Sequence, residues 1–148
     1  ESSMSFREKS LWVMLLAIAL SAFFYGHAVA YVNHEQFETV PWQSMKVHAP
    51  MVLMFHIAVA VLVVFAILGH LVIVLFDRRT KEDERDRLIA LKGSRVGGLV
   101  LATGVFLALW LAVASNGNFW FTQVLLGFWV LAQMMDYVVQ LILHRRGR

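Results

Sequence analysis

Four long apolar runs constrain this chain more than any other feature. They cover residues 11–32, 51–76, 96–114 and 119–143. A helix needs roughly 20 mostly apolar residues to cross a bilayer, and each run is close to that length. Lipid satisfies no backbone polar groups, so only helices and closed barrels span it, and a barrel would need alternating residues that these runs lack. We therefore predict an all-α fold, an integral membrane bundle of four antiparallel transmembrane helices, with residues 1–148 as a single domain.

The composition excludes several classes of protein. Of the 148 residues, 59% are hydrophobic and only 16% are charged. A soluble domain is nearer 45–50% apolar and about 25% charged, so neither a disordered chain nor an ordinary soluble enzyme is expected. The chain has no cysteine. Disulfide scaffolds, zinc–thiolate sites and iron–sulfur clusters are excluded with it.

The basic residues predict an orientation. Twelve of the 13 Lys and Arg residues precede the first run, lie between the second and third, or follow the fourth, and Lys46 alone lies between the first and second. Cytoplasmic loops carry the excess of Lys and Arg, so we expect a multi-pass protein with both termini cytoplasmic. These charges suit contact with anionic lipid at the cytoplasmic face. We expect the lipid bilayer as the partner and no nucleic acid.

The third run carries a packing pattern. Gly97, Gly104, Ala108, Ala112 and Ser115 fall close to one helical face. Small residues spaced in this way let a neighbouring helix approach closely. We interpret the stripe as packing inside the bundle, joined to the fourth helix by the short turn at residues 115–118. The alternative is a contact with a second copy or with a partner membrane subunit.

Asp136 is the most unusual residue of the fourth run. A carboxylate inside a span is costly and normally points inward to a partner. With Gln133 and Gln140 it forms a polar stripe at helical spacing. Arg95 and His70 match its depth from neighbouring runs, so we predict a buried polar cluster of these five residues. Arg95 is the expected ion-pair partner and His70 the second, and a proton or ligand site is the functional alternative to a structural pair.

The histidines offer a different chemistry. His56 and His70 are 14 residues apart, which places them on one helical face about 21 Å apart. This spacing resembles the two-haem helix of b-type cytochromes, in which each iron needs an axial ligand from both sides. His27 matches the depth of His56, but no histidine lies opposite His70. A single haem b between His27 and His56 is therefore the alternative to our expectation of no cofactor.

A metal site near the loop at residues 33–50 is a further hypothesis. Four histidines could gather there, His27, His34, His48 and His56, with Glu35 and Glu38 close in sequence. Imidazole with carboxylate suits zinc or copper. These residues lack the spacing of known metal-ligand motifs, so the sequence leaves a metal site unassigned.

No catalytic motif is visible, neither a nucleophile elbow nor a phosphate-binding glycine loop. We therefore expect a small membrane protein that is not an enzyme and acts as an accessory, regulatory or small transport component. An electron-carrying haem protein is the alternative. The sequence names neither a substrate nor an oligomeric state.

Two segments carry a family resemblance. Asp-Glu-Arg-Asp at 83–86 and Lys-Gly-Ser-Arg at 92–95 precede the third run, and the last helix ends in the arginine-tipped segment 144–147. Together they resemble an uncharacterised family of small bacterial multi-pass inner-membrane proteins. The resemblance covers the chain from Glu82 onward and implies a bacterial inner membrane. It implies no mechanism, and the three histidines of the runs are not part of it.

Overall fold

The computed structural model describes residues 5–76 and 84–146. Its elements are α1 (Phe6–Val32), α2 (His34–Thr39), the 3-10 helix η1 (Trp42–Ser44), α3 (Ala49–Phe76), α4 (Glu84–Ala114) and α5 (Phe119–Arg146). The four long helices are each long and apolar enough to cross a membrane. Each contains one of the predicted runs, so the predicted all-α architecture is confirmed.

Local signals explain where α1 begins and ends. The Ser5 hydroxyl accepts a hydrogen bond from the backbone N–H of Glu8 at 3.2 Å, and the Glu8 carboxylate accepts one from the backbone N–H of Ser5 at 2.9 Å. This reciprocal capping box satisfies two N–H groups that the helix leaves without partners. At the other end, the buried Asn33 side chain donates to the carbonyl of Val29 at 2.8 Å. The chain then turns into α2.

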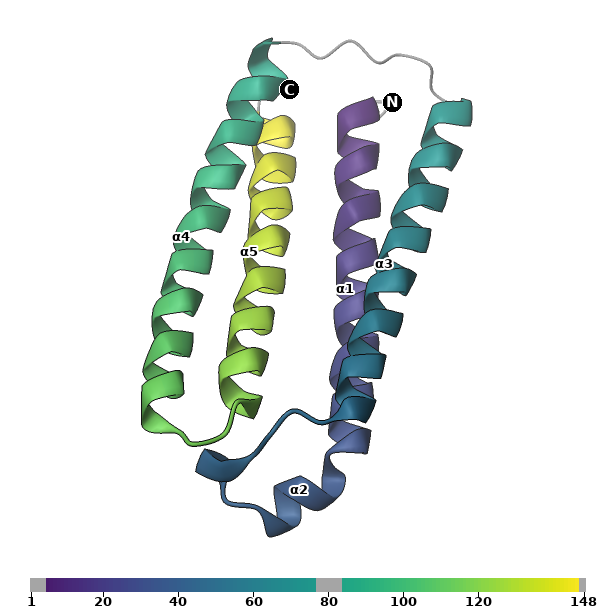
Figure 1. Ribbon diagram of the computed structural model, residues 1–148. Coiled ribbons are helices and arrows are strands. Elements are labelled where there is room, and N and C mark those ends of the chain that lie inside the picture. The colour runs from purple at the N-terminus through teal and green to yellow at the C-terminus, as the bar shows by residue number, and fades with distance from the viewer. Residues whose placement is uncertain (1–4, 77–83, 147–148) are drawn as a thin grey trace.

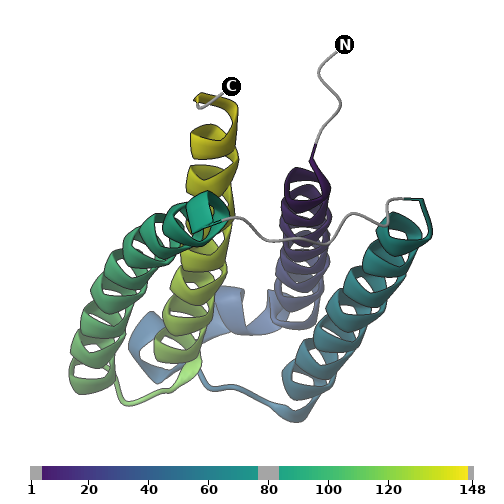
Figure 2. The ribbon, with the colours of Figure 1, turned by 90° about the horizontal axis from the view of Figure 1, so that it is seen from above.

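The long helices form an open arc in the order α3–α1–α5–α4 (Figures 1 and 2). Neighbours in the arc run antiparallel, and both termini lie at the same end of the molecule (Figure 1). The principal contacts of α3 are with α1 and those of α4 are with α5, while α1 against α5 joins the two helix pairs. We call the end that carries the termini the charged end and the opposite one the outer-loop end.

The tight pairing of α4 with α5 depends on small residues. A Cβ atom on Gly97 would lie 2.8 Å from the carbonyl oxygen of Ala132, and one on Gly104 would overlap the side chain of Phe128. Ala108 is also buried, whereas Ala112 is exposed. Gly97 and Gly104 of the predicted stripe therefore face α5, as expected for packing inside the bundle, and Ala108 lies one turn beyond Gly104 on the same helical face.

The outer-loop end is closed by a docked turn. The backbone N–H groups of Asn116 and Gly117 donate to the carbonyl of Gln43 at 2.9 and 2.8 Å. A Cβ on Gly117 would collide with the backbone of Met45, so only glycine allows this approach. Beneath the turn, a small core contains four buried residues: Val29, Met45, Met51 and Phe119.

Candidate functional site

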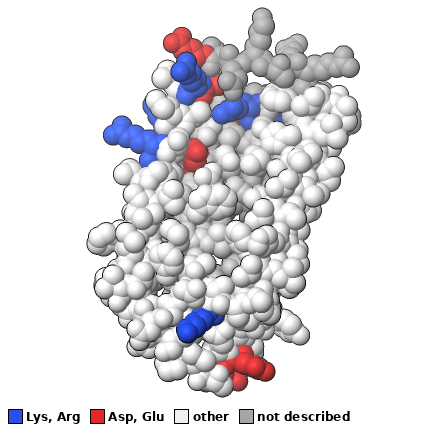
Figure 3. Space-filling model, viewed as in Figure 1, with Lys and Arg blue, Asp and Glu red and all other residues white. Residues whose placement is uncertain are grey.

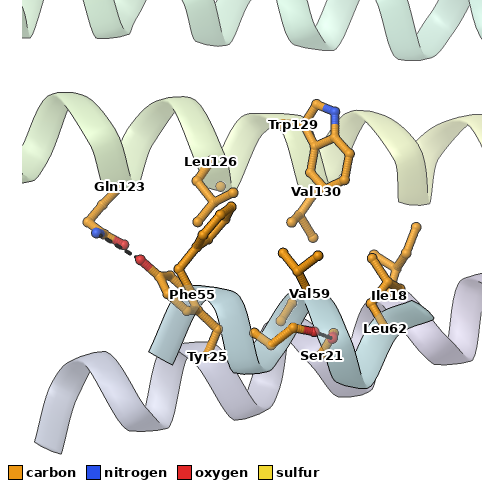
Figure 4. A pocket seen from close by; sticks show the side chains of 13 residues that line it. Ile18, Ser21, Tyr25, Phe55, Val59, Leu62, Gln123, Leu126, Trp129 and Val130 are labelled. Carbon is orange, nitrogen blue, oxygen red and sulfur yellow. Dashed lines mark hydrogen bonds between the residues drawn. The ribbon is translucent and has the colours of Figure 1, made fainter. Parts of the chain in front are cut away.

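A cavity of about 200 Å³ lies between α1, α3 and α5 (Figure 4). Its walls are almost entirely apolar and open to the surface of the molecule. Aromatic side chains come from all three helices, among them Tyr25, Phe55 and Trp129. Gly127 of α5 also lines it, and a Cβ at that position would meet no atom within 4 Å. The cavity is thus an apolar recess within the membrane-spanning part of the helices.

A second cavity, of about 610 Å³, continues the first toward α4 and the outer-loop end. The two cavities share the side chains of Tyr25, Phe55, Leu126 and Trp129. Because these residues line both, the two cavities are neighbours, and we call them together the lateral groove.

Polar groups are few in this groove. The Gln123 amide donates to the Tyr25 hydroxyl at 3.2 Å, a bond that joins α1 to α5 (Figure 4). The Ser21 hydroxyl donates to the carbonyl of Ala58 at 2.6 Å and so joins α1 to α3. The Ser21 hydroxyl is therefore used in a hydrogen bond between helices. The Tyr25–Gln123 pair presents a phenol and an amide to an otherwise apolar space.

A polar stripe on α5 is the second candidate site. Asp136, Gln140 and His144 follow one another at steps of four residues, so they lie on successive turns of one face. The Gln140 amide nitrogen donates to Oδ1 of Asp136 at 2.7 Å. Gln140 and His144 are only 5% and 7% exposed, and Gln140 Oε1 and His144 Nε2 are buried without a hydrogen-bond partner among the described residues. We call these three residues the α5 stripe.

The stripe ends at a group of charges (Figure 3). His144 Nδ1 lies 3.5 Å from Oδ1 of Asp86, at the start of α4, and Asp86 is partly exposed. Glu8 and Arg7, from the first turn of α1, also act electrostatically on His144. Three helices therefore bring charged groups together at the charged end.

Arg95 does not meet Asp136. Gly93 and Gly97 both face Asp136, because a Cβ on either would contact its atoms. Arg95 lies midway between them, about 200° around the helix from each, and is exposed. The expected ion pair is therefore absent from the part of the chain that the structure describes: Arg95 matches Asp136 in depth but points away from α5.

His70 and Gln133 are also separate from Asp136. The Ser10 hydroxyl of α1 lies 2.8 Å from Nε2 of His70, and Nδ1 of His70 is 2.7 Å from the carbonyl of Ala66. His70 thus joins α3 to α1 rather than reaching α5. Gln133 is half-buried, and no hydrogen bond of its side chain appears among residues 5–76 and 84–146. Of the predicted cluster, the structure brings together Asp136 and Gln140.

His27 and His56 both lie on exposed surface. Nδ1 of His27 is 3.2 Å from the carbonyl of Phe23, and Nδ1 of His56 is 2.7 Å from that of Val52. A carbonyl only accepts, so Nδ1 is the donor in both contacts, and Nε2 is the ring nitrogen that does not take part in them. No contact between the two rings occurs within the described residues.

The loop histidines make ordinary surface contacts. Nε2 of His34 lies 3.5 Å from an exposed Glu38 carboxylate, and Nδ1 of His48 lies 3.1 Å from the Gln36 amide. Within the described ranges, no three His, Asp or Glu side chains gather in a way that could hold a metal ion.

The lateral groove was not predicted from the sequence, because it depends on the order of helices in the arc. One signal was available. Tyr25, Gln123 and Gly127 interrupt apolar runs with two polar groups and a missing side chain, as a recess with a polar point requires.

No protein-family model, curated protein or solved structure matches the chain. The family resemblance of its second half stays a prediction.

Proposed function

We propose that the chain is a small, non-enzymatic accessory or transport component that holds a long-chain apolar ligand in the lateral groove. The ligand class is a lipid-like molecule with one polar group. The observation that carries this proposal is the groove itself, an aromatic-lined recess that opens sideways within the apolar part of the helices.

The position of the groove favours a ligand drawn from the bilayer. Binding pockets are typically lined by apolar and aromatic side chains, with a few polar groups that fix orientation. Here the Tyr25 hydroxyl and the Gln123 amide supply that polar point. Tyr25 lies seven residues before the end of α1, about 10 Å along the helix axis from the outer-loop end. Because Tyr25 lines both cavities, a bound molecule would place its polar group where the two cavities meet.

The membrane and the orientation belong to the same proposal. The family resemblance of residues 82–148 supports a bacterial inner membrane, and the distribution of basic residues supports both termini in the cytoplasm, by the positive-inside rule. The charged end would then face the cytoplasm and contact anionic lipid, and the groove would face the outer leaflet. The exposed apolar surface of α3 leaves room for a second copy or a partner membrane subunit.

The binding proposal can be tested by filling the groove. Gly127→Leu adds a side chain to the first cavity, where a Cβ meets no neighbour. Gly98→Leu is the matched control, because Gly98 is exposed on α4, lines neither cavity and also has open space around its Cβ. The parent protein for this assay keeps Trp129 and has the other four of its five tryptophans replaced by phenylalanine. Quenching of the Trp129 fluorescence then reports binding of a brominated long-chain alcohol.

We expect saturable quenching in the parent protein and in Gly98→Leu. Gly127→Leu should weaken binding about tenfold or more, equivalent to at least about 1.4 kcal/mol. Circular dichroism would confirm that each variant is helical. Quenching that rises without saturation in the parent protein, or identical saturation in both leucine variants, would contradict the proposal.

An electron-carrying haem protein is the second candidate. It is supported by the hydrogen bonds from Nδ1 of His27 and His56 to their own helix, which leave Nε2 available as an iron ligand. Because both side chains are exposed, such a haem would lie at the lipid-facing surface. A reduced-minus-oxidised visible spectrum of the purified protein tests this candidate. A b-type haem band that is lost in His56→Ala would support the haem protein, and a spectrum without such a band would contradict it.

A further inference from the structure

The α5 stripe has no role in the lateral groove, and it combines features of a proton site. Asp136 is a carboxyl group inside a span, about 12 Å along the helix axis from His144. Ionisable residues at such positions are expensive and commonly serve ion or proton pathways. Within the described residues no basic side chain forms an ion pair with Asp136, and its one hydrogen bond comes from Gln140.

The route to solution follows successive turns of α5. Asp86 is partly exposed and lies 3.5 Å from His144. His144 is the next polar residue inward, and an imidazole ring can accept a proton at one nitrogen and release one from the other. Gln140 follows, and its amide contacts Asp136 directly. The buried atoms without partners, Gln140 Oε1 and His144 Nε2, lie on adjacent turns between the two ends of this route.

From these observations we propose that Asp136 is a proton-binding site reached from the charged end through His144 and Gln140. One proton from solution passes to the Asp136 carboxylate and converts it to a neutral carboxylic acid, which removes one negative charge from the span. Gln140 remains hydrogen-bonded to the oxygen that it already contacts. No oxidant, reductant or metal takes part.

The surroundings allow this change of charge. The face of α4 packed against Asp136 presents Gly93 and Gly97, which carry no charge. Tyr137, on α5 itself, is the adjacent titratable group, and Arg7 of α1 acts electrostatically on it. Around His144, Asp86 and Arg85 belong to α4 and Glu8 and Arg7 to α1. Charges of both signs thus surround the entrance, while the inner end is bordered by two glycines on α4 and by Tyr137, on which Arg7 acts.

Infrared difference spectroscopy after a pH jump tests the site on the full chain in lipid nanodiscs. Protonation of Asp136 should produce the carbonyl band of a carboxylic acid. The band should vanish in Asp136→Asn and shift in frequency in Asp136→Glu, which keeps the test valid if the asparagine variant fails to fold. A parent protein without this band, or a band unaffected in both variants, overturns the proposal.

The rate at which the band appears tests the route. His144→Gln removes the titrating group and keeps a polar side chain, so the band should appear more slowly by on the order of a hundredfold, as expected when a positioned proton carrier is lost. Gln140→Leu should slow it similarly. The matched control is His34→Gln, the same substitution at the outer-loop end, which should leave the rate unchanged. Equal rates in all three variants would show that protons reach Asp136 by another route.

Discussion

Adjacent glycines on α4 provide a direct test of the helix packing. Gly97 and Gly98 are neighbours in sequence but differ completely in surroundings. A Cβ on Gly97 would lie 2.8 Å from the carbonyl oxygen of Ala132 and 3.2 Å from Cβ of Asp136, whereas a Cβ on Gly98 would meet nothing within 4 Å. The same substitution to alanine therefore tests contact with α5 at one position and solely the backbone preference at the other.

The expected magnitudes follow from two effects. Replacing glycine by alanine inside a helix favours the helix by about 0.8–1 kcal/mol at both positions. Inserting a methyl group into a packed contact costs about 1–3 kcal/mol, and this applies only at Gly97, where the backbone of α5 must move. Gly98→Ala should thus stabilise the protein slightly. Gly97→Ala should be less stable than Gly98→Ala by about 1–3 kcal/mol, the packing cost alone.

The measurement is the free energy of unfolding of both variants in mixed micelles, followed by circular dichroism as the fraction of denaturing detergent rises. Because the propensity effect cancels between the variants, their difference reports the packing of α4 against α5. Equal stabilities would refute the argument, since they would show that Gly97 does not face a neighbouring backbone. A Gly97→Ala variant more stable than Gly98→Ala would be still stronger evidence against this packing.

Two further predictions concern topology and the groove. Single cysteines at Asn116 and Arg145, in a chain with no cysteine of its own, should react with an impermeant reagent from opposite sides of the membrane, with Arg145→Cys on the cytoplasmic side; the reverse result would invert the proposed orientation. Tyr25→Phe should destabilise the protein by about 0.6 kcal/mol, the average for a hydrogen bond between membrane helices, because it removes the acceptor of the Gln123 amide. Thermal unfolding in detergent measures this cost. In a Gln123→Leu background, where the hydrogen bond is already lost, Tyr25→Phe should cost little. An unchanged unfolding midpoint in Tyr25→Phe alone would contradict the hydrogen bond.

The sequence predicted the helices and one of their contacts. Apolar length alone identifies the four spans, because lipid leaves few alternatives to a helix. The small residues Gly97, Gly104 and Ala108 predicted a close internal contact, and the structure places both glycines against α5 and buries Ala108. Both successes depend on backbone geometry, which a short sequence pattern describes well.

The predicted ion pair between Arg95 and Asp136 is wrong for a geometric reason. Arg95 was matched to Asp136 by depth in the membrane, and depth ignores direction around the helix. Gly93 and Gly97 already mark the face of α4 that meets α5, so Arg95, about 200° away, had to point elsewhere. His70 could not be assigned in the same way, because its partner Ser10 depends on α3 lying beside α1. That order follows from tertiary packing.

The order of the arc has a physical basis in apolarity. The most apolar 18-residue stretches of the outer helices α3 and α4 have mean hydropathies of 3.0 and 2.3, whereas those of the central α1 and α5 have 2.0 and 1.5. Apolar surface does not distinguish a neighbouring helix from lipid, so polar side chains and small residues must specify which helices meet. The polar contacts across the centre fit this reasoning, with Tyr25–Gln123 near the outer-loop end and Arg7 and Glu8 beside His144 at the charged end. The two helices whose apolar stretches have the lowest mean hydropathy are central, and they carry the polar groups that join the two hairpins. Both candidate sites therefore involve them.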